Sequence, residues 1–577
     1  MAHHISKLQI LNYKSCKNLL IDLTPYTPMV GYNNAGKSNI LSALEWLLDD
    51  KLLPPSDYND PNLDISIEGI VNGVTEEVLQ RLSDEHREPL RPFIGDGIVR
   101  IKRTQPANAA KKADVRLEIY NFVQDSFQKN PRGIWNAIKA LFPDPIKIGA
   151  MENAADDASK AKSTSTIGKL LKEISVSIQQ AQTLRISRHL DAISRRIDAD
   201  GSKRIQELNY IDRQINNTLV NYFPGVNIKL HFEMPNLEEL LNSGTVKVYE
   251  QNQTGREISS YGHGTQRSVQ MALIQYLSEI KQNNESITTT LLLIDEPELY
   301  LHPFAIEQVR EALHSLSESG YQIVFTTHSA QMITEDRAQH TLLIRKNNQD
   351  GTHSRKRLND AISQVVPDAI SQANHLFSLS QSTKILFANE VILTEGKTEL
   401  RLLPFIYQKV KNKTLGQNNT ALIETGSVDN IGKTIQILRE MDLPTKAIVD
   451  MDYLFKGAIH SRIVSADNPD LVALRTILNE LKDQGVIQMK GDTPGAKHCE
   501  ALVKDARSII HINNLHQLLK AQNIWVWQKG SIESHLGLRG KNEGEWAGFK
   551  NRINMVGNDI NSVCADPISV NDLIAWL

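Results

Sequence analysis

The C-terminal third of this 577-residue chain holds acidic residues that each follow a short apolar run. Such runs predict buried strands of a parallel sheet, and the carboxyl ends of neighbouring parallel strands meet at one edge of the sheet. Carboxylates at that edge suit Mg²⁺ or Mn²⁺, and two such ions would activate a water and stabilise the leaving oxygen of a phosphodiester. The predicted metal ligands are Glu395, Glu399, Asp450, Asp452 and Glu533.

Two of these acids and one lysine receive catalytic roles in the prediction. We assign Glu395 and Asp450 to the metal-dependent step, and Lys529 would neutralise charge that builds on the scissile phosphate. An Asp-x-Asp pair alone, such as Asp450 with Asp452, is common in solvated turns. Four acidic elements in this order favour the metal site over that plainer interpretation.

A phosphate-binding pattern lies near the start of the chain. Residues 31–38 read Gly-Tyr-Asn-Asn-Ala-Gly-Lys-Ser and fit G-x-x-x-x-G-K-[ST], between an apolar run that ends at Val30 and helical spacing over 39–48. Backbone N–H groups and the helix dipole would hold the phosphates, Lys37 would reach the β- and γ-phosphates, and Ser38 would hold Mg²⁺. The predicted nucleotide-binding residues of this loop are Gly31, Asn33, Asn34, Ala35, Gly36, Lys37, Ser38 and Asn39.

Two later apolar runs end in residues that would complete the nucleotide site. The run that begins at 291 ends in Asp295, a second Mg²⁺ ligand, and Glu296, which would orient the attacking water. The run that begins at 321 ends in His328, placed to contact the γ-phosphate. A lone histidine is more often structural, but together with Asp295 and Glu296 we favour a functional one.

A glycine pair opens another predicted helix, over 269–277. Gly262, Gly264 and Gln266 would let backbone N–H groups approach a phosphate at the helix N-terminus. The pattern Gly-x-Gly-x-Gln is weak by itself.

The remaining sequence predicts an α/β protein with a helical insertion. Alternation at 65–70 and 97–103 predicts antiparallel strands, and strands return over 227–250. Residues 345–351 predict a loop, and residues 359–389 predict helices. Residues 152–222 nearly lack glycine and proline and show helical periodicity. They would either pack on their own chain or form a dimer arm; we favour the dimer arm, because a long two-sided insertion has little else to pack against.

The predicted domain boundaries follow from these patterns. Two halves of an ATPase, 1–151 and 223–350, flank the helical insertion 152–222. Linker helices over 351–384 then lead to a C-terminal α/β domain over 385–577.

Composition limits the possible partners and location. The net charge is −3, so any nucleic-acid contact must come from local basic patches. The three cysteines are far apart and have no metal-ligand spacing, which is typical of a reducing compartment. No apolar run approaches the ~20 residues that span a bilayer, and the N-terminus lacks a signal-peptide pattern. We predict a cytoplasmic protein with no membrane partner.

The nucleotide motifs resemble the ABC-type ATPase module of the RecF and SMC group. The block Asp-Glu-Pro-Glu-Leu-Tyr-Leu-His-Pro at 295–303 is quite specific for that branch. The resemblance implies ATP as cofactor, and it implies that the segment from Gly262 to Gln266 completes the nucleotide site of a second subunit. This segment departs from the usual Leu-Ser-Gly-Gly-Gln.

Residues 385–577 resemble the Toprim domain. Glu395 and Glu399 match its first acidic motif, and Asp450 and Asp452 match its Asp-x-Asp motif. Further along, Lys529 and Glu533 match the downstream Lys-Gly-x-x-Glu element of the OLD nucleases, a family with a Toprim domain.

The two resemblances in one chain are those of OLD-family nucleases, which include the nuclease subunit of the Gabija antiphage system and nuclease effectors encoded beside retrons. They imply an ATP-regulated, divalent-metal-dependent DNA endonuclease in bacterial antiviral defence. They also imply a homodimer or higher homo-oligomer through the helical insertion and the ATPase modules. A helicase subunit, or a retron reverse transcriptase with its msDNA, would fit as partner. The alternative is a RecF/SMC-like DNA-repair ATPase whose Toprim domain binds DNA without cutting it; that alternative needs a damaged metal site, and none of the expected acids is missing.

Overall fold

The computed structural model shows two compact units. One contains residues 1–27, 36–332 and 347–352, and the other contains residues 28–35, 333–346 and 353–577. The residues described are 3–143, 145–149, 170, 180–221, 223, 225–232, 246–249, 254–281, 289–338, 340–365, 382–426, 428–487, 494–557 and 559–577. No helix among them is long and apolar enough to cross a membrane.

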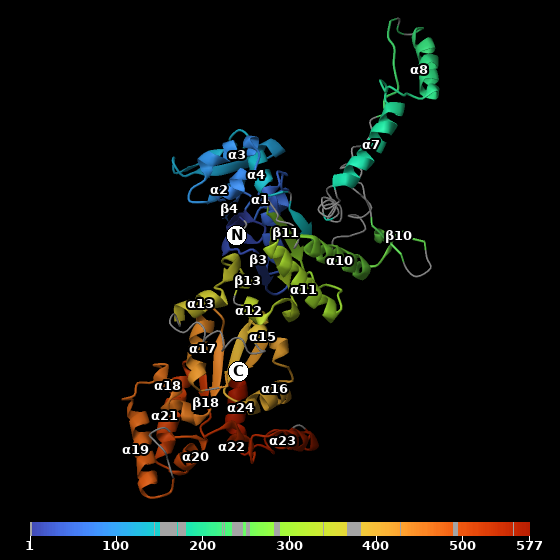
Figure 1. The fold of residues 1–577 in the computed structure, drawn as a ribbon. Helices are drawn as coiled ribbons and strands as arrows, with labels where there is room; N and C mark the ends of the chain where they lie inside the picture. The colour runs from blue at the N-terminus through green and yellow to red at the C-terminus, as the bar shows by residue number, and fades with distance from the viewer. Residues whose placement is uncertain are drawn as a thin grey trace. The chain divides into compact units, whose positions relative to one another are not determined.

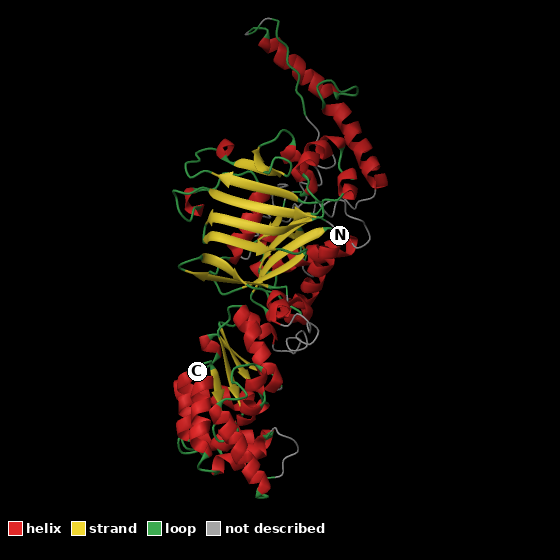
Figure 2. Cartoon of the chain, turned by 90° about the vertical axis from the view of Figure 1, so that its left-hand side faces the viewer, coloured by secondary structure: helices red, strands yellow, loops and turns green. Residues whose placement is uncertain are grey.

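Within these ranges, twelve strands form one large sheet in the order β7-β6-β5-β4-β1-β2-β14-β13-β3-β12-β11-β8, drawn as yellow arrows in Figure 2. The run from β7 to β2 is antiparallel, and its strands β4 and β5 alternate between buried and more exposed side chains, as expected for a sheet with one face on the core. The bounds are β1 (His4–Tyr13), β2 (Cys16–Asp22), β4 (Ile65–Asn72), β5 (Val99–Gln105), β6 (Arg116–Asn121) and β7 (Ser126–Lys129). These strands confirm the alternation predicted at 65–70 and 97–103.

Beyond β14, which pairs antiparallel with β2, the large sheet contains parallel pairs of mostly buried strands. Strand β11 (Thr290–Asp295) pairs with β12 (Tyr321–Thr327) and with β8 (Ile146–Ile148), and β13 (Leu342–Asn347) pairs with β3 (Tyr26–Val30). Continuous apolar runs form such strands because both faces are covered. The covering and connecting helices are α1 (Lys37–Leu48), α2 (Glu76–Gln80), α3 (Asp84–Leu90), α4 (Ile134–Leu141), α10 (His263–Lys281), α11 (Pro303–Glu318) and α12 (Glu335–Ala338).

The described part of the helical insertion contains α7 (Gln180–Ile197) and α8 (Gln206–Leu219). Both keep large apolar side chains exposed, among them Ile193 at 47 % and Ile211 at 41 %. The rest of the periodicity predicted over 152–222 lies mostly outside the described residues.

The second unit holds a smaller sheet in the order β16-β15-β17-β18, with every pairing parallel. Its strands are β15 (Glu390–Thr394), β16 (Thr420–Glu424), β17 (Thr445–Val449) and β18 (Ile524–Val526). Helices pack beside this sheet in the yellow to red part of Figure 1. They are α13 (Leu358–Val365), α15 (Ser382–Phe387), α16 (Lys397–Lys411), α17 (Val428–Glu440), α18 (Gly457–His460), α19 (Pro469–Asp483), α20 (Ala496–Lys504), α21 (Ser508–Lys520), α22 (Ile532–Leu536), α23 (Glu543–Met555) and α24 (Pro567–Trp576).

Two local predictions are wrong in part. Residues 345–351, predicted as a loop, form a turn only at 348–350, while 345–347 end β13 and 351 begins β14 (Gly351–Arg355). Arg345 in β13 is buried and donates to the carbonyl oxygen of Ala388 at 3.1 Å. The strands predicted over 227–250 reduce, in the described part, to β9 (Lys247–Val248), which pairs with β10 (Arg256–Glu257). Residues 226–232 are irregular.

Candidate nucleotide-binding and metal-binding sites

The phosphate-binding pattern lies between a strand and a helix, as predicted. Strand β3 ends at Val30, and α1 begins at Lys37. Gly36 has a φ of +98°, and a Cβ there would stand 2.1 Å from Thr352 Oγ1. A Cβ on Gly31 would stand 2.4 Å from the carbonyl oxygen of Ile344. Only glycine fits either position, because a side chain would clash at both and would also be strained at Gly36.

The predicted chemistry-bearing residues of the ATPase converge around α1. Ser38 Oγ donates to Asp295 Oδ2 at 2.6 Å, and Lys37 Nζ donates to His328 Nε2 at 2.9 Å. The Nε2 atom of His328 also lies 3.5 Å from Glu296 Oε1. Strands β11 and β12 bring these groups together because they are parallel neighbours, with Asp295 opposite Thr326. The other predicted residues of the loop differ in exposure: Asn33 and Asn34 are exposed, and Ala35 is buried. Asn39 Nδ2 donates to Ser15 Oγ at 2.7 Å.

Two residues without a role in the prediction hold this arrangement in place. Arg267 is 4 % exposed and donates from Nη2 to the carbonyl oxygens of Asp295 at 2.8 Å and Glu296 at 2.7 Å. Glu298 Oε1 accepts from Thr327 Oγ1, from the backbone N–H of His328 and from that of Ser329. The burial of the charged Arg267 side chain beside the motif shows its role, and no signal in the sequence marks it.

The two glycines at the start of α10, Gly262 and Gly264, have open space where a side chain would lie, unlike the glycines of the phosphate loop. A Cβ at Gly262 would meet no described atom within 4 Å, and at Gly264 it would meet only Tyr300 Cβ at 3.8 Å. Gln266 is buried, and its Nε2 donates to the carbonyl oxygen of Tyr261 at 2.6 Å. Packing within this chain therefore does not require glycine at 262.

In the second unit, the predicted acids gather at the carboxyl ends of adjacent parallel strands. Glu395 follows β15, Asp450 follows β17, and Glu533 lies in α22 beyond β18. The strand pairs align Thr394 with Ile448 and Val449 with Val526. Glu399 belongs to the first turn of α16, and Asp452 belongs to a 3₁₀ turn directly after Asp450.

The electrostatics of this cluster call for a cation. Burial raises the pKa of Glu395 to about 8, with Asp450 and Asp452 adding to the shift. Burial, then Glu533 and Asp452, raise the pKa of Asp450 to about 7, and burial with Asp450 raises the pKa of Glu399. Among the described residues, Glu395 Oε2, Asp450 Oδ1 and Asp452 Oδ1 are buried without a hydrogen-bond partner. Unpartnered carboxylate oxygens are the donors that Mg²⁺ and Mn²⁺ prefer.

These carboxylates fit a divalent ion by chemistry but do not already enclose one. Within the described ranges, no three His, Cys, Asp or Glu side chains form a set that could hold a metal as they stand. A bound ion therefore requires the carboxylates to close around it.

Lys541, a lysine that the sequence analysis did not identify, contacts two of the predicted metal-binding carboxylates. Lys541 Nζ lies 3.3 Å from Asp450 Oδ2 and 3.6 Å from Glu533 Oε2, and these carboxylates raise the pKa of the lysine. Lys529, predicted for the scissile phosphate, instead pairs with Asp566 Oδ2 at 3.0 Å. No motif marks Lys541, which is one lysine in a polar stretch.

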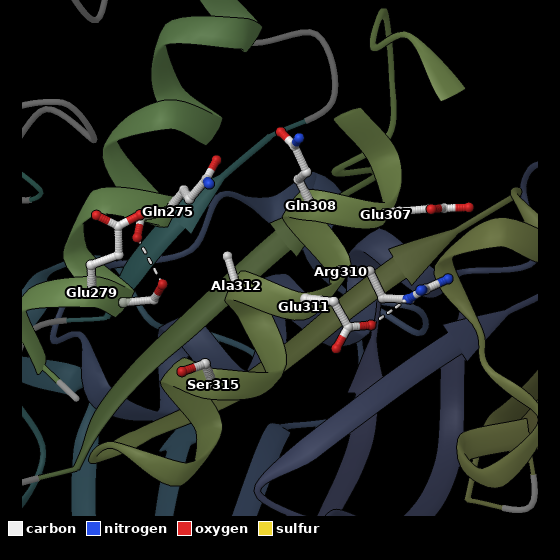
Figure 3. Close-up of a pocket in the computed structure, with 9 residues that line it drawn as sticks. Gln275, Glu279, Glu307, Gln308, Arg310, Glu311, Ala312 and Ser315 are labelled. Carbon is white, nitrogen blue, oxygen red and sulfur yellow. Dashed lines mark hydrogen bonds and ion pairs between the residues drawn. The ribbon is translucent and has the colours of Figure 1, made fainter. Parts of the chain in front are cut away.

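A polar hollow of about 490 Å³ runs along α10 and α11 in the first unit (Figure 3). Glu279, Glu307 and Glu311 are among the residues that line it. It contains none of the predicted site residues.

Comparisons with known proteins define the class of protein. Residues 27–333 match the family described as "AAA domain, putative AbiEii toxin, Type IV TA system". Residues 386–452 match "Overcoming lysogenization defect protein-like, TOPRIM domain". The chain therefore combines a P-loop ATPase with a Toprim domain, and its fold class is α/β as predicted. Both kinds of domain generally use a nucleotide or a divalent metal.

Relatives extend the similarity over the whole chain. The chain is 37 % identical to the "Old nuclease" of Escherichia phage P2 over 100 % of both chains. It is 21 % identical to the "OLD nuclease" of Thermus scotoductus over 78 % of this chain and 82 % of that one. It is also 21 % identical to "Endonuclease GajA" of Bacillus cereus over 89 % of this chain and 80 % of that one. The chain belongs to the OLD nuclease family, and the predicted resemblance is confirmed.

Proposed function

We propose that this protein is an ATP-regulated, divalent-metal-dependent DNA endonuclease of bacterial antiphage defence. The observation that carries the nuclease is the set of buried carboxylates at the ends of β15, β17 and β18, with oxygens of Glu395, Asp450 and Asp452 lacking partners among the described residues. The names of the relatives support DNA cleavage. The defence role rests on family analogy.

Bound divalent ions would supply an activated water and stabilise the leaving oxygen of the phosphodiester. Glu395, Glu399, Asp450, Asp452 and Glu533 would hold them. Glu533 is fixed in orientation, because its Oε1 accepts from Thr398 Oγ1 at 2.5 Å. Lys541 would offset the negative charge of the scissile phosphate, since it already lies against these acids. Lys529 would act less directly, because Asp566 balances its charge.

The ATPase would act through the residues that converge on α1. Lys37 would bind the phosphates, while Ser38 and Asp295 would hold Mg²⁺. Glu296 would orient the attacking water, and His328, already within reach of both Lys37 and Glu296, would contact the γ-phosphate. Gly262 and Gly264 would face the nucleotide of a second ATPase module, which explains glycine where the chain's own packing does not require it.

The helical insertion would join two copies of the chain. Exposed apolar side chains on α7 and α8 support this role, because an apolar stripe left in water is unfavourable. Ile211 and Ile215 lie one turn apart on α8 and are 41 % and 36 % exposed. Changing both to aspartate should yield monomers by light scattering; an unchanged oligomer would remove this arm as the interface.

The deciding experiment is plasmid cleavage by the full-length protein with Mg²⁺ or Mn²⁺, with and without ATP. Asp450→Asn should abolish cleavage and leave ATP binding intact. Asp483→Asn, at an exposed acid of α19, is the matched control and should cut like the wild type. Lys37→Ala should remove ATP binding without destroying the metal-dependent site.

Each outcome has a separate meaning. Cutting by the Asp450→Asn variant would refute the metal site. If the wild type and every variant bind DNA but do not cut it, even after addition of partners that co-purify from the host, the result would favour the alternative function. That alternative is a DNA-repair ATPase whose Toprim domain binds DNA without cutting it. The candidate partners are a helicase subunit and a retron reverse transcriptase with its msDNA.

A further inference from the structure

The first unit holds a second hollow whose wall contains a buried cation. The hollow measures about 620 Å³, which is in the range of sites for small organic ligands. Arg103 on β5 and Trp135 on α4 line it, together with the apolar side chains of Val115, Leu117 and Ile134. The chemistry proposed above for the ATPase and the Toprim domain uses none of these residues.

Arg103 is the unusual member of this wall. The residue is 2 % exposed, and its Nε donates to the carbonyl oxygen of Leu47 at 3.1 Å. Its Nη2 is buried and has no hydrogen-bond partner in the part of the chain that the structure describes. Burial lowers its pKa to about 10, so the guanidinium still carries its charge at neutral pH. A buried charged donor without an acceptor is costly, and an entering acceptor would remove that cost.

The neighbours of Arg103 define what kind of molecule would enter. The guanidinium carbon lies 4.7 Å from the centre of the Trp135 ring. Asp50 and Lys112 also line the hollow and pair with each other at 2.9 Å, and both side chains are well exposed to solvent. Burial lowers the pKa of Arg103 and outweighs Asp50 and then Asp49, which favour its charged form. Among the charged residues of the wall one positive charge is in excess, and Arg103 carries its charge beside aromatic and apolar side chains.

The polar hollow of Figure 3 shows the contrast. Its cation, Arg310, already donates to the carbonyl oxygen of Gln331 at 2.7 Å and pairs with Glu311 at 2.9 Å. The other charged side chains of that hollow are the carboxylates of Glu279, Glu307 and Glu311, which would repel an anion.

We propose that the hollow at Arg103 is a binding site for a small organic anion in which a flat apolar body carries one carboxylate. The carboxylate pairs with the guanidinium of Arg103, whose buried Nη2 turns toward the hollow to donate, and the apolar body lies along Trp135 and Leu117. Charge-assisted hydrogen bonds to a guanidinium are the strong class of hydrogen bond, and the low local dielectric strengthens this one further.

The test compares two probes of nearly the same shape. Phenylacetate and its neutral amide, phenylacetamide, are titrated into the full-length protein, and binding is followed by ligand-observed NMR. The carboxylate should bind about tenfold more tightly than the amide. Equal binding of the two probes, or no binding of either up to about 10 mM, would overturn the proposal.

Variants locate the effect at Arg103. Arg103→Gln should remove the preference for the carboxylate. Arg100→Gln is the matched control on the same strand, because Arg100 alternates to the other face and pairs with Glu68 at 2.7 Å. An unchanged preference in Arg103→Gln would contradict the site.

An exposed variant keeps the test usable if Arg103→Gln does not fold. Lys112→Glu adds negative charge at the hollow and frees Asp50, and the side chain of Lys112 is 64 % exposed, so folding should tolerate the change. It should weaken phenylacetate binding several-fold and leave phenylacetamide binding unchanged. Equal effects on both probes would count against an anion site.

Discussion

Lys541 Nζ lies 3.3 Å from Asp450 Oδ2, so a cationic side chain of the protein itself contacts one of the proposed metal ligands. The two residues are 91 positions apart in the sequence. The same ammonium lies 3.6 Å from Glu533 Oε2. Lys541 therefore lies against the proposed metal ligands, whereas Lys529, to which the sequence analysis assigned the scissile phosphate, pairs with Asp566.

The two lysines should therefore differ in their effect on cleavage. Lys541→Gln should lower the rate of plasmid cleavage by about 100-fold, because it removes a charge beside the reacting phosphate. Lys529→Gln should cost less, because Asp566 already balances that lysine. Single-turnover cleavage at saturating Mn²⁺ measures both. If Lys529→Gln is the more damaging change, the assignment to Lys541 is wrong.

The buried carboxylates predict how stability depends on pH in the presence of a chelator. The pKa of Asp450 is raised to about 7 and that of Glu395 to about 8, so the folded state binds protons that the unfolded chain has released. Stability should therefore fall as pH rises from about 4 to about 8. Thermal melts in EDTA at pH 5.5 and pH 8 should show this drop. Asp450→Asn should reduce the drop, and excess Mn²⁺ at pH 8 should reverse it in the wild type. A rise in melting temperature over the same range would contradict the raised pKa values.

Glu298 should matter for ATP hydrolysis more than for ATP binding. Its Oε1 holds the backbone N–H groups of His328 and Ser329, which fixes the loop that presents the imidazole. Glu298→Ala should lower the ATPase rate by about tenfold and leave ATP affinity close to normal. Glu298→Gln keeps one acceptor oxygen and should fall between that variant and the wild type. A loss of affinity equal to the loss of rate would assign Glu298 to the binding of ATP instead.

Alanine substitutions at two glycines should separate the two halves of the proposed nucleotide site. Gly36→Ala adds about 1–2 kcal/mol of left-handed strain and a clash with Thr352, so ATP binding should be lost. Gly262→Ala meets no described atom, so the melting temperature and ATP binding should stay normal. ATP hydrolysis should nevertheless fall if a second module closes over that position. Normal hydrolysis by Gly262→Ala would remove the second-module role.

Continuous apolar runs made the central strands predictable. The runs at 291 and 321 became β11 and β12, and those before Glu395 and Asp450 became β15 and β17, because buried parallel strands need apolar side chains on both faces. Period-two alternation predicted β4 and β5, because only one face of these strands is buried and needs apolar side chains. The sequence also identified the acids that gather at the edge of the smaller sheet and, separately, the residues that gather around the phosphate loop.

The missed features depend on tertiary contacts that no local pattern records. The segment with Arg345 looked like a loop because its residues are polar, but the guanidinium finds buried carbonyl partners. Arg267 fixes the backbone at Asp295 and Glu296 from a separate helix. Lys541 and Arg103 each acquire their importance from residues distant in sequence, so neither stands out in a linear scan.

The order of the strands along the chain has a consequence for protein synthesis. The last strand of the large sheet, β14, ends at Arg355, and the first proposed metal ligand is Glu395. A ribosome therefore completes every described strand of the ATPase sheet before it adds any of the cluster acids. An interrupted translation product can carry the ATPase sheet without the proposed metal-binding acids, but never the full acid set without that sheet. Synthesis from the N-terminus thus delivers the proposed metal-binding acids already attached to the domain proposed to regulate them.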